Sequence, residues 1–423
     1  MNVLLIGNGG REHALAWKLR QSPRITKLYC APGNGGISRE AECLPVDLKS
    51  LESILRIATQ LKPDVTVVGP ELPLQLGIVD EFTRRGWPVF GPTKAAAQLE
   101  TSKSFAKEFM QRHRIPTSHY AICDSTDDVN DAIGRFSTPV VIKADGLAAG
   151  KGVVICNVKD EAVATASEML SGKMLGGAGA RVVIEECLKG DELSFLVLSD
   201  GERVAPLVAA QDHKRAADGD TGPNTGGMGA YSIPQLLDEQ MSNWLLQHVA
   251  RPVIDGMKAE GMTYKGILYC GLMMTARGPM VLEFNCRFGD PETQPILMRL
   301  DSDLLEAIEA SIEGRVSDGD FHWSQDASVC VVMASGGYPG TIEVGKKITG
   351  IDDADKVEGV KVFHAGTSVR DGEFYTAGGR VLGVTSRAAT LQIAVDRAYE
   401  AVGKIQFEGA HYRKDIAARA LKK

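Results

Sequence analysis

The sequence predicts a multidomain protein of mixed α/β and α+β class, with a doubly wound parallel sheet at its N-terminus and a small α+β domain at its C-terminus. A chain of 423 residues is longer than one hydrophobic core usually organises. Strand-like and helix-like segments alternate through the first hundred residues, which is typical of a parallel sheet covered by helices. A polar segment at residues 317–327 precedes the last hundred residues, where strands and a helix alternate again.

Glycine-rich loops follow the predicted strands of the N-terminal region. We expect these strands at residues 2–6, 27–30, 64–68 and 88–90. The loops GNGG, APGNGG, GPELPL and GPT come next, and loops at the carboxyl ends of parallel strands are where such sheets bind ligands. Glu12 stands where the dinucleotide fingerprint needs its third glycine, so a nicotinamide cofactor is disfavoured. The region predicts a site for an anionic small molecule instead.

A second informative stretch covers residues 139–156. Two apolar strands flank a loop that carries several glycines and Lys151, and Lys143 lies on the incoming strand. Glycines let a backbone approach phosphates closely, and lysines supply positive charge. We interpret the stretch as a phosphate-covering hairpin, although a merely flexible hairpin would have the same glycines. It is not a Walker A loop, because a strand and not a helix follows it.

Residues 211–232 form a long segment with glycines, charges and little apolar content. A stretch of this length without a periodic pattern is more often a functional loop than part of the scaffold. It offers Asp212, Arg215 and Asn224 as polar contacts. His213 has charged neighbours, so we expect it to be exposed, and it is only a weak candidate for a general base.

The third informative stretch is residues 281–294, VLEFNCRFGDPETQ. Glu283 and Asn285 lie two residues apart on a predicted strand, so both point to one face of a sheet. Carboxylate and amide oxygens suit Mg²⁺, which often takes only one or two protein ligands. Arg287 adds a permanent cation, while Cys286 has no nearby histidine in sequence and is a poor candidate nucleophile. The alternative is a strand that ends in a polar turn.

The remaining segments have the character of scaffold. We expect a long amphipathic helix at residues 236–260, a strand at 265–275 and two helices before residue 314. Further on we expect strands at 328–334, 361–364 and 381–385 and a helix at 390–405. Neither paired carboxylates nor a metal-ligand cluster is evident in the last hundred residues, so we expect this domain to play a supporting role.

Composition limits the partners. The chain is 44% hydrophobic and 24% charged, with a formal net charge of -7 and no basic run, so nucleic acid is an unexpected partner. The apolar runs are far shorter than the roughly 20 residues that span a bilayer. Eight scattered cysteines with no C-x-x-C pair suggest reduced thiols. We therefore expect a cytoplasmic protein, without membrane partners and monomeric.

The order of these features resembles the ATP-grasp superfamily. More specifically, the blocks VLLIGNGGREHALAW, APGNGG, VIKADGLAAGKGV, QDHKR, GPNTGGMGAYS and EFNCRFGDPETQ resemble the phosphoribosylamine–glycine ligase family, and the resemblance extends from residue 3 to about residue 415. It implies a central ATP-grasp fold with a mobile lid. The implied domains are residues 1–102, an N-terminal substrate-binding domain; 103–315, the ATP-grasp domain with its lid at about 120–188; and 316–423.

The resemblance implies an ATP-dependent ligase of purine biosynthesis. ATP would phosphorylate the carboxylate of glycine, and the amine of 5-phosphoribosylamine would attack the resulting acyl phosphate to give glycinamide ribonucleotide, ADP and phosphate. The implied partners are ATP, glycine, 5-phosphoribosylamine and a divalent metal, Mg²⁺ or Mn²⁺. Such phosphoryl transfer depends mainly on positioning and charge neutralisation.

The resemblance also implies roles for individual residues. ATP would contact Lys103, Lys143, Gly150, Lys151, Gly152, Glu185, Leu188, Glu192, Arg215 and Asn224. The metal would be held by Glu283 and Asn285. Arg287 would neutralise charge during phosphoryl transfer, Asp212 and Asp290 would orient glycine or phosphoribosylamine, and Gly9 and Gly10 would face the phosphoribosyl phosphate.

Two rivals have distinct sequence signatures. Another ATP-grasp carboxylate–amine ligase should lack the QDHKR and RFGDPETQ blocks, and both are present. A non-catalytic nucleotide sensor should have lost the phosphate or metal groups, yet Lys103, Lys143 and Glu283 are in place. One departure concerns the wider superfamily, since the strand before Glu283 carries no second carboxylate, which leaves the number of metal ions open.

Overall fold

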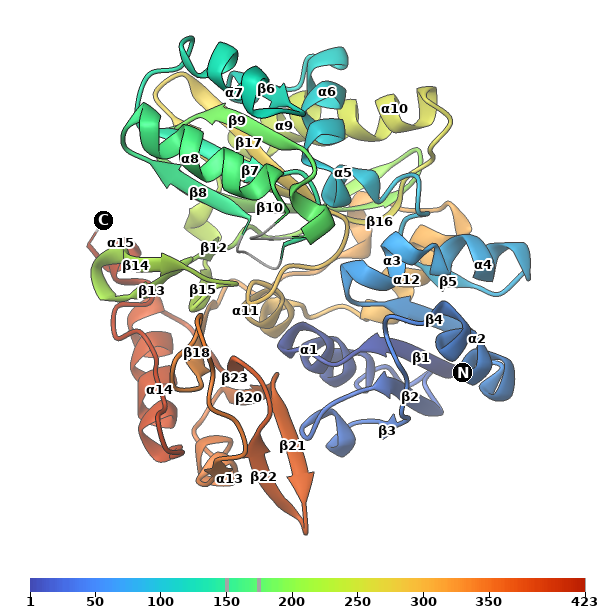
Figure 1. Ribbon diagram of the computed structural model, residues 1–423. Helices are drawn as coiled ribbons and strands as arrows, with labels where there is room; N and C mark the ends of the chain where they lie inside the picture. Colours follow the sequence, from blue (N-terminus) through green and yellow to red (C-terminus); the bar gives the residue numbers. More distant parts are fainter. Residues whose placement is uncertain (149–151, 173–175, 423) are drawn as a thin grey trace.

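The structure is a computed structural model that describes residues 1–148, 152–172 and 176–422. Three groups of elements surround a common centre, with the N-terminal sheet, the central sheets and the C-terminal sheet on different sides of it (Figure 1). Parallel strands occur in the N-terminal sheet, whereas the central and C-terminal sheets are antiparallel. The predicted class of a multidomain α/β and α+β protein is confirmed.

The N-terminal sheet has the strand order β3-β2-β1-β4-β5 and is parallel throughout. Its strands are β1 (Asn2–Gly7), β2 (Lys27–Pro32), β3 (Glu42–Cys43), β4 (Val65–Val68) and β5 (Val89–Phe90). The helices of this region are α1 (Gly10–Leu19), α2 (Leu51–Leu61), α3 (Glu71–Leu76) and α4 (Ile78–Arg84). Because β1 lies between β2 and β4, the strand order reverses beside the GNGG loop, which is where open α/β sheets bind ligands.

The alternation of β1 explains why both faces of this sheet are covered. Leu4 and Ile6 belong to a core that includes residues of α2 and α4, whereas Val3 and Leu5 belong to another core that includes residues of α1. Successive side chains of a strand point to opposite faces, so a continuous apolar run is buried on both sides. The run NVLLI therefore specifies a central strand rather than an edge strand.

The central region contains two antiparallel sheets. One has the order β11-β10-β16-β17, with β10 (Asp191–Asp200), β11 (Val204–Pro206), β16 (Lys265–Thr275) and β17 (Gly278–Asn285). The other has the order β6-β9-β7-β8, with β6 (Tyr120–Cys123), β7 (Val140–Ala144), β8 (Val153–Cys156) and β9 (Val182–Glu186), together with α7 (Thr126–Ile133) and α8 (Lys159–Leu170). This second unit has a hydrophobic core of its own, formed by residues from β6, α7, β7, β8, α8 and β9.

The predicted helix at residues 236–260 is interrupted. It begins at Glu239, after Asp238 accepts a hydrogen bond from the backbone N–H of Met241, and is divided into α9 (Glu239–Leu245), a π-helical turn (Leu246–Ala250) and α10 (Arg251–Ala259). Pro252 lies two residues after the end of the π turn, and proline cannot donate the backbone hydrogen bond that an α-helix needs there. The other helices around the centre are α5 (Gln98–Thr101), α6 (Lys103–Arg112), α11 (Thr293–Arg299) and α12 (Leu304–Glu313).

The C-terminal sheet takes two of its strands from the middle of the chain. Its order is β12-β15-β18-β23-β20, in which β12 (Gln211–Asp212) and β15 (Gly229–Ser232) come from the segment predicted to be an irregular loop. That prediction was wrong in this respect, because the two short strands obtain their hydrogen-bond partners from each other and from β18, almost a hundred residues later. The central segment and the C-terminal sheet are therefore joined by the hydrogen bonds of paired strands.

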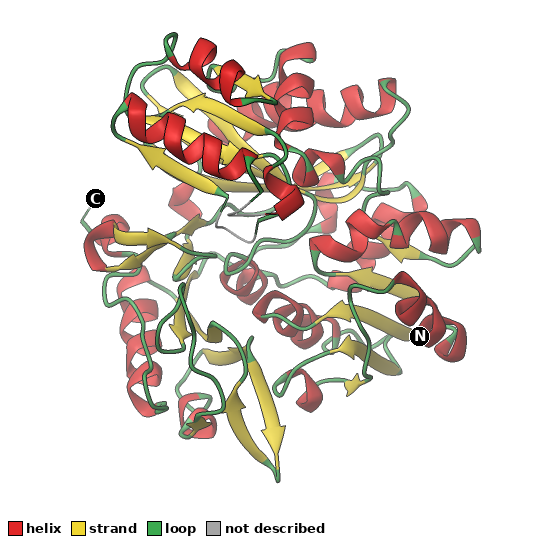
Figure 2. Cartoon of the chain, in the orientation of Figure 1, coloured by secondary structure: helices red, strands yellow, loops and turns green. Residues whose placement is uncertain are grey.

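The rest of the C-terminal region packs on this sheet. Its strands are β18 (Ala327–Ala334), β20 (Val360–His364) and β23 (Arg380–Ala388), with a separate sheet of β19 (Lys347–Ile348), β22 (Glu373–Thr376) and β21 (Thr367–Arg370). Its helices are α13 (Ile351–Ala354), α14 (Leu391–Lys404) and α15 (Ala418–Leu421). Figure 2 shows the strands of this region between helices, with α14 along one side. In the described part of the chain, no helix combines the length and apolar character needed to cross a membrane.

Two buried histidines lie where the N-terminal and C-terminal regions meet. His13 on α1 accepts a hydrogen bond at Nδ1 from the backbone N–H of His364, at 2.7 Å. Asn34, from the APGNGG loop, donates to the backbone carbonyl of His364 at 2.8 Å. Burial lowers the pKa of His364 to about 3, with Arg39 and Lys361 acting in the same direction. This junction therefore holds neutral imidazoles.

Replacing His364 should make stability less dependent on pH. In the folded chain the ring stays neutral down to about pH 3, whereas in the unfolded chain it takes up a proton below a pKa of about 6.5. The unfolded state then binds more protons, so stability falls as the pH falls, by roughly 2 kcal/mol for this group between pH 7 and pH 5. We expect His364→Asn to reduce the pH 7 to pH 5 loss in urea unfolding by about that amount. Phe374→Leu, which removes a ring 4.7 Å from that of His364, is the control and should destabilise equally at both pH values.

Candidate active site

A cavity of about 520 Å³ lies between the two central sheets. Its walls include side chains of β7, β8 and β9 on one side and of β10, β16 and β17 on the other. Residues of the 211–226 segment and of the turn after β17 complete it. The cavity therefore brings together residues of the stretches 139–156, 211–226 and 281–294, each more than fifty residues from the next along the chain.

The strand β17 brings Glu283 and Asn285 to this cavity. Both line it, while Phe284 between them is 2% exposed and packs into the core. Asn285 accepts a hydrogen bond at Oδ1 from Nη2 of Arg287, at 3.2 Å. The strand alternation predicted from sequence thus places one carboxylate and one amide oxygen in the same space.

Glu283 is a partly exposed anion among four cations. Burial alone would raise the pKa of this carboxyl, but Lys214, Lys143, Lys103 and Arg287 outweigh it and lower the pKa to about 2. Nζ of Lys214 lies 3.6 Å from Oε1 of Glu283. The group is therefore ionised at neutral pH and is available to a cation. In the described residues, no group of three or more His, Cys, Asp or Glu side chains could hold a metal, so any metal here would need further ligands from substrate or water.

Arg287 is held by two carboxylates that sequence analysis did not single out. Nη2 lies 2.7 Å from Oε1 of Glu100, and Nε lies 3.4 Å from Oε2 of Glu71. Burial raises the pKa of Glu100, although Arg287 opposes the shift. Both acids lie more than 180 residues before Arg287 in sequence, and no local pattern relates them to it. Their contact depends on the packing of α3 and α5 against the end of β17.

Glu185 is the centre of a buried ion cluster. Its Oε2 lies 2.8 Å from Nζ of Lys107 and accepts a hydrogen bond from Ser118, while its Oε1 lies 2.9 Å from Nζ of Lys143. Burial opposes ionisation, but the two lysines lower the pKa of Glu185 below its ordinary value. Burial also lowers the pKa of Lys107 to about 8. Both carboxylate oxygens are engaged, so Glu185 orients Lys143 as well as facing the cavity.

Lys107 was not among the predicted site residues, although its spacing from Lys103 is a signal in the sequence. Lys103 and Lys107 are four residues apart, so they share one face of α6. Lys103 lines the cavity and donates to the carbonyl of Gly146, at 3.3 Å. The start of α6 is further tied to the hairpin by Asp145, which accepts at Oδ1 from the backbone N–H of Ser104 at 2.6 Å.

The connection after β9 supplies another wall of the cavity. Leu188 and Glu192 line it, and Glu192 pairs with Lys214 at 3.3 Å. Gly152, from the hairpin, lines the opposite side. Gly150 and Lys151 lie outside the described residues. Arg215 and Asn224 are opposite one another in the β13–β14 pair and both reach the cavity.

His213 is buried, contrary to the expectation that it is exposed. Its exposed fraction is 1%, and its ring lies near Gly229 and Ala417 instead of the charged neighbours in sequence. Burial lowers its pKa to about 4, with Arg413 and Arg419 contributing. His213 therefore packs as a neutral ring between the central segment and the C-terminal segment.

The two candidate substrate carboxylates differ in environment. Burial, together with Glu292, raises the pKa of Asp212 well above its ordinary value. Burial acts in the same direction on Asp290, but Arg380 and Arg11 outweigh it and lower its pKa. The chain thus places a carboxyl that readily holds a proton and an ionised carboxylate along one cavity.

Asp290 also connects the cavity to the N-terminal loop. Its Oδ2 accepts a hydrogen bond from the backbone N–H of Arg11, at 3.4 Å. Added Cβ atoms at Gly9 and Gly10 would lie 3.4 Å and 3.6 Å from the Asp290 carboxylate. The backbone N–H of Gly9 donates a hydrogen bond to the carboxylate of Glu12 at 2.6 Å. Glu12, which replaces the third glycine of the dinucleotide fingerprint, therefore stabilises this loop.

The C-terminal domain contributes directly to the site. Nη1 of Arg380 donates to the carbonyl oxygens of Gly226 and Asp290, at 2.6 and 2.8 Å. We expected the C-terminal domain to have only a supporting role, so this direct contact with the cavity was not predicted. Nothing in the local sequence marks Arg380, because its partners are 90 and more residues away.

Cys286 has the environment of a structural thiol. It is 1% exposed, and its Sγ faces the carbonyls of Ala96 and Ala97. Burial raises its pKa far above the ordinary value, with Glu100 contributing. A thiolate nucleophile would need the opposite shift.

Comparisons with known protein families match nearly the whole chain. Residues 1–100 match the family described as Phosphoribosylglycinamide synthetase, N domain, residues 101–293 match its ATP-grasp (A) domain, and residues 328–419 match its C domain.

Known proteins that are similar to this chain over nearly its whole length support the same family. The phosphoribosylamine–glycine ligase of Pseudomonas aeruginosa is 49% identical over 424 residues, with 100% of this chain and 98% of that protein covered. The crystal structure of the corresponding ligase from Thermotoga maritima is 34% identical with a TM-score of 0.87, and 98% of this chain and 100% of that chain are covered. A biotin carboxylase domain from Hydrogenobacter thermophilus, solved with magnesium ADP, is 18% identical with a TM-score of 0.71 over 97% of this chain and 91% of that chain, which shows a shared fold.

Removing the carboxylate of Glu185 should destabilise the central sheets. Glu185→Gln leaves the buried Lys107 ammonium without its anion, and breaking a buried ion pair typically costs about 3 kcal/mol or more. Adding Lys107→Met to the same chain should recover part of this loss, because the uncompensated charge is removed. The measurement is the urea unfolding midpoint of the two single variants and the double variant.

Glu186→Gln is the matched control for that experiment. Glu186 is next to Glu185 on β9 but pairs with Arg277, whose side chain is 53% exposed. Exposed pairs contribute about 1 kcal/mol or less. Fully additive losses in Glu185→Gln and Lys107→Met would contradict the buried cluster, because coupled residues do not add.

Proposed function

Because this chain belongs to the phosphoribosylamine–glycine ligase family, we propose that the cavity between its central sheets joins glycine to 5-phosphoribosylamine through a glycyl phosphate. The chain is an ATP-dependent ligase of purine biosynthesis, as the sequence predicts. One observation carries the assignment of the site: Glu283 and Asn285 line the same cavity as Lys103, Lys143, Lys214 and Arg287.

The first step is phosphoryl transfer from ATP to glycine. A carboxylate oxygen of glycine attacks the γ-phosphorus, the bond to the bridging oxygen of ADP breaks, and ADP leaves with that electron pair. Lys103 and Lys143 lie where they can neutralise the phosphates, and Arg287 lies beside Asn285. Fixed cations in a site that excludes water stabilise the charge that builds up in the transition state.

The adenosine end of ATP has a separate set of contacts in our proposal. Leu188 and Glu192 follow β9 at the edge of the cavity, and Gly152 approaches from the hairpin. Glu185 contributes mainly through Lys143, since both of its oxygens are paired. Arg215 and Asn224 contact the nucleotide from the β13–β14 pair.

Mg²⁺ or Mn²⁺ fits the oxygen donors of β17. Glu283 is ionised, with a pKa of about 2, and Asn285 presents an amide oxygen two residues later. Two protein ligands with phosphate and water oxygens for the rest is the usual arrangement for Mg²⁺ at nucleotide sites. Bound there, the metal would supply charge neutralisation at the phosphates.

The second step is acyl transfer to the amine. The nitrogen of 5-phosphoribosylamine attacks the acyl carbon, the C–O bond to phosphate breaks, and the amine loses a proton as phosphate departs. Asp290 is ionised beside the N-terminal glycines, so it can hold and orient an amine. Asp212 lies at the same cavity, and we propose that it orients the other substrate. Gly9 and Gly10 would face the sugar phosphate.

We also propose the domain limits and the setting in which the protein works. The limits are residues 1–102, 103–315 and 316–423, with a lid at about 120–188, and the family matches at 1–100, 101–293 and 328–419 support this division. We expect a cytoplasmic monomer whose partners are its small-molecule substrates. A net charge of -7 argues against nucleic acid.

Phosphate release should require both substrates and Glu283. We expect release from ATP and Mg²⁺ only when glycine and freshly generated 5-phosphoribosylamine are both present, and a loss of about 100-fold or more in Glu283→Ala, because charge stabilisation is removed from the transition state. Glu202→Ala is the control, since Glu202 pairs with Lys258 in an exposed contact outside the cavity. Equal turnover in Glu283→Ala and the native chain would refute the metal role. ATP binding without stimulation by either substrate would refute the substrate assignment.

ATP should close the lid. The β6-β9-β7-β8 unit has its own core and pairs its strands only among themselves in the described residues, which supports movement as one body. Closure would protect backbone amides at the cavity, so we expect amide exchange in residues 140–148 and 152–156 to slow by about tenfold with saturating ATP and Mg²⁺. Exchange in β1 should stay constant. Unchanged exchange in the hairpin would contradict the lid.

A further inference from the structure

A ribbon formed by residues 215–224 carries two of the proposed ATP contacts. It consists of β13 (Arg215–Ala217), a 3-10 turn (Asp218–Asp220) and β14 (Thr221–Asn224), and its two strands form a sheet of their own. Of its ten residues, all of which the structure describes, Ala216 alone is buried. A two-stranded ribbon without a core is at best marginally stable in water. Something outside the ribbon must hold Arg215 and Asn224 in place.

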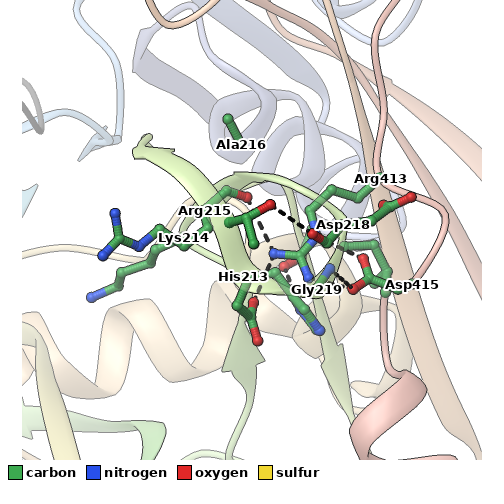
Figure 3. Close-up of polar contacts among 12 residues, drawn as sticks. His213, Lys214, Arg215, Ala216, Asp218, Gly219, Arg413 and Asp415 are labelled. Carbon is green, nitrogen blue, oxygen red and sulfur yellow. Dashed lines mark hydrogen bonds and ion pairs between the residues drawn. The ribbon is translucent and has the colours of Figure 1, made fainter.

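The contacts that hold it come from residues 411–419. Figure 3 shows Arg413 and Asp415 against the turn of the ribbon, with Lys214 and Arg215 extending away from them. Nη1 of Arg413 lies 2.8 Å from Oδ1 of Asp220 and donates to the carbonyl of Arg215 at 3.2 Å. The backbone N–H of Gly219 donates to Oδ2 of Asp415, at 2.8 Å.

Further contacts extend along the whole length of the turn. Nε2 of His411 lies 2.8 Å from the carbonyl of Ala216, the N–H of Lys414 donates to Asp218 at 2.8 Å, and Nη2 of Arg419 lies 2.9 Å from Oδ2 of Asp220. In the part of the chain that the structure describes, the polar contacts from the ribbon to other segments end within residues 411–419.

Residues 411–419 are themselves held in place by contacts within the C-terminal domain. Arg413 is 1% exposed and makes two contacts with Asp415, at 2.7 and 2.8 Å. The hydroxyl of Tyr399 on α14 donates to the carbonyl of Arg413 and accepts from the N–H of Ile416. Ile416 and Ala417 belong to the core of the C-terminal domain. The position of the ribbon therefore depends on the folded C-terminal domain.

We propose that residues 411–419 form a positioning segment for the nucleotide site, in which Arg413 and Asp415 hold the 215–224 ribbon so that Arg215 and Asn224 meet ATP. The inference rests on the proposed contact of these two residues with the nucleotide. Arg413 acts through the ribbon and touches neither substrate nor ATP. The C-terminal domain thereby determines nucleotide affinity as well as contributing Arg380.

The test compares full-length variants by steady-state kinetics and amide exchange. Arg413→Met should raise the KM for ATP about tenfold, change the KM for glycine less than twofold, and speed amide exchange in residues 215–224 about tenfold. Arg413 is fully buried, so Asp220→Asn serves as a second variant: its side chain is 39% exposed and it weakens the same link from the ribbon side. We expect it to raise the KM for ATP about threefold.

A matched control is available in the same domain. Val402 on α14 is 2% exposed and belongs to the core of the C-terminal domain, so Val402→Ala should destabilise this domain yet leave the KM for ATP and exchange in the ribbon unchanged. A mere loss of stability in the C-terminal domain would change the KM for ATP in Val402→Ala as well as in Arg413→Met. Equal changes in both variants would therefore overturn the proposal.

The coupling between Arg413 and the ATP contact can be measured directly. Arg215→Met should raise the KM for ATP by itself, and combining it with Asp220→Asn should add little, because both changes remove one interaction. Additive effects would overturn the positioning role, as would faster exchange in the ribbon at an unchanged KM for ATP. If Arg215→Met leaves the KM for ATP unchanged, the inference fails with its premise. In that case the native chain would still show turnover that requires both substrates. Failure of the proposed function would instead show as the absence of substrate-stimulated turnover in the native chain.

Discussion

Buried cations need nearby anions, and this requirement connects the separate parts of the structure at one cavity. Lys107 and Lys143 share Glu185, Arg287 is held between Glu100 and Glu71, and Lys214 lies between Glu192 and Glu283. An unpaired charge in such surroundings would cost several kcal/mol. The acidic residues therefore stabilise the lysine and arginine side chains of this cavity and fix their positions.

Pairing alone does not explain the site, because its residues come from all three domains. The N-terminal loop meets Asp290 through the backbone of Arg11, the two central sheets enclose the cavity, and Arg380 reaches it from the C-terminal sheet. The strands β12 and β15 join the central segment to the C-terminal sheet by continuous hydrogen bonding. Within the described residues, the β6-β9-β7-β8 unit has a hydrophobic core of its own beside the cavity. The lid movement proposed for this unit would suit a reaction that must admit three substrates and then exclude water.

Much of the fold and part of the site could be predicted from the sequence, because the relevant signals are local. The run NVLLI indicated a strand buried on both faces, and the alternation of VLEFN indicated that Glu283 and Asn285 share a side. Two elements differ from the prediction. The strands β12 and β15 were not predicted because β18, which pairs with β15, is distant in sequence. The interruption of the expected helix at 236–260 is local, a π turn that ends two residues before Pro252.

The sequence by itself determined the fold class, the family and the residue types that phosphoryl transfer needs, since glycine loops, strand periodicity and long characteristic blocks are all readable along the chain. Tertiary structure alone decided which charges neutralise one another and what holds each group in place. His213 is buried against the C-terminal segment despite its charged neighbours in sequence, and Glu100 and Arg380 join the site from segments with no local mark of function. The physical reason is that burial and ion pairing depend on distances in space, and these distances exist only once the sheets have packed together.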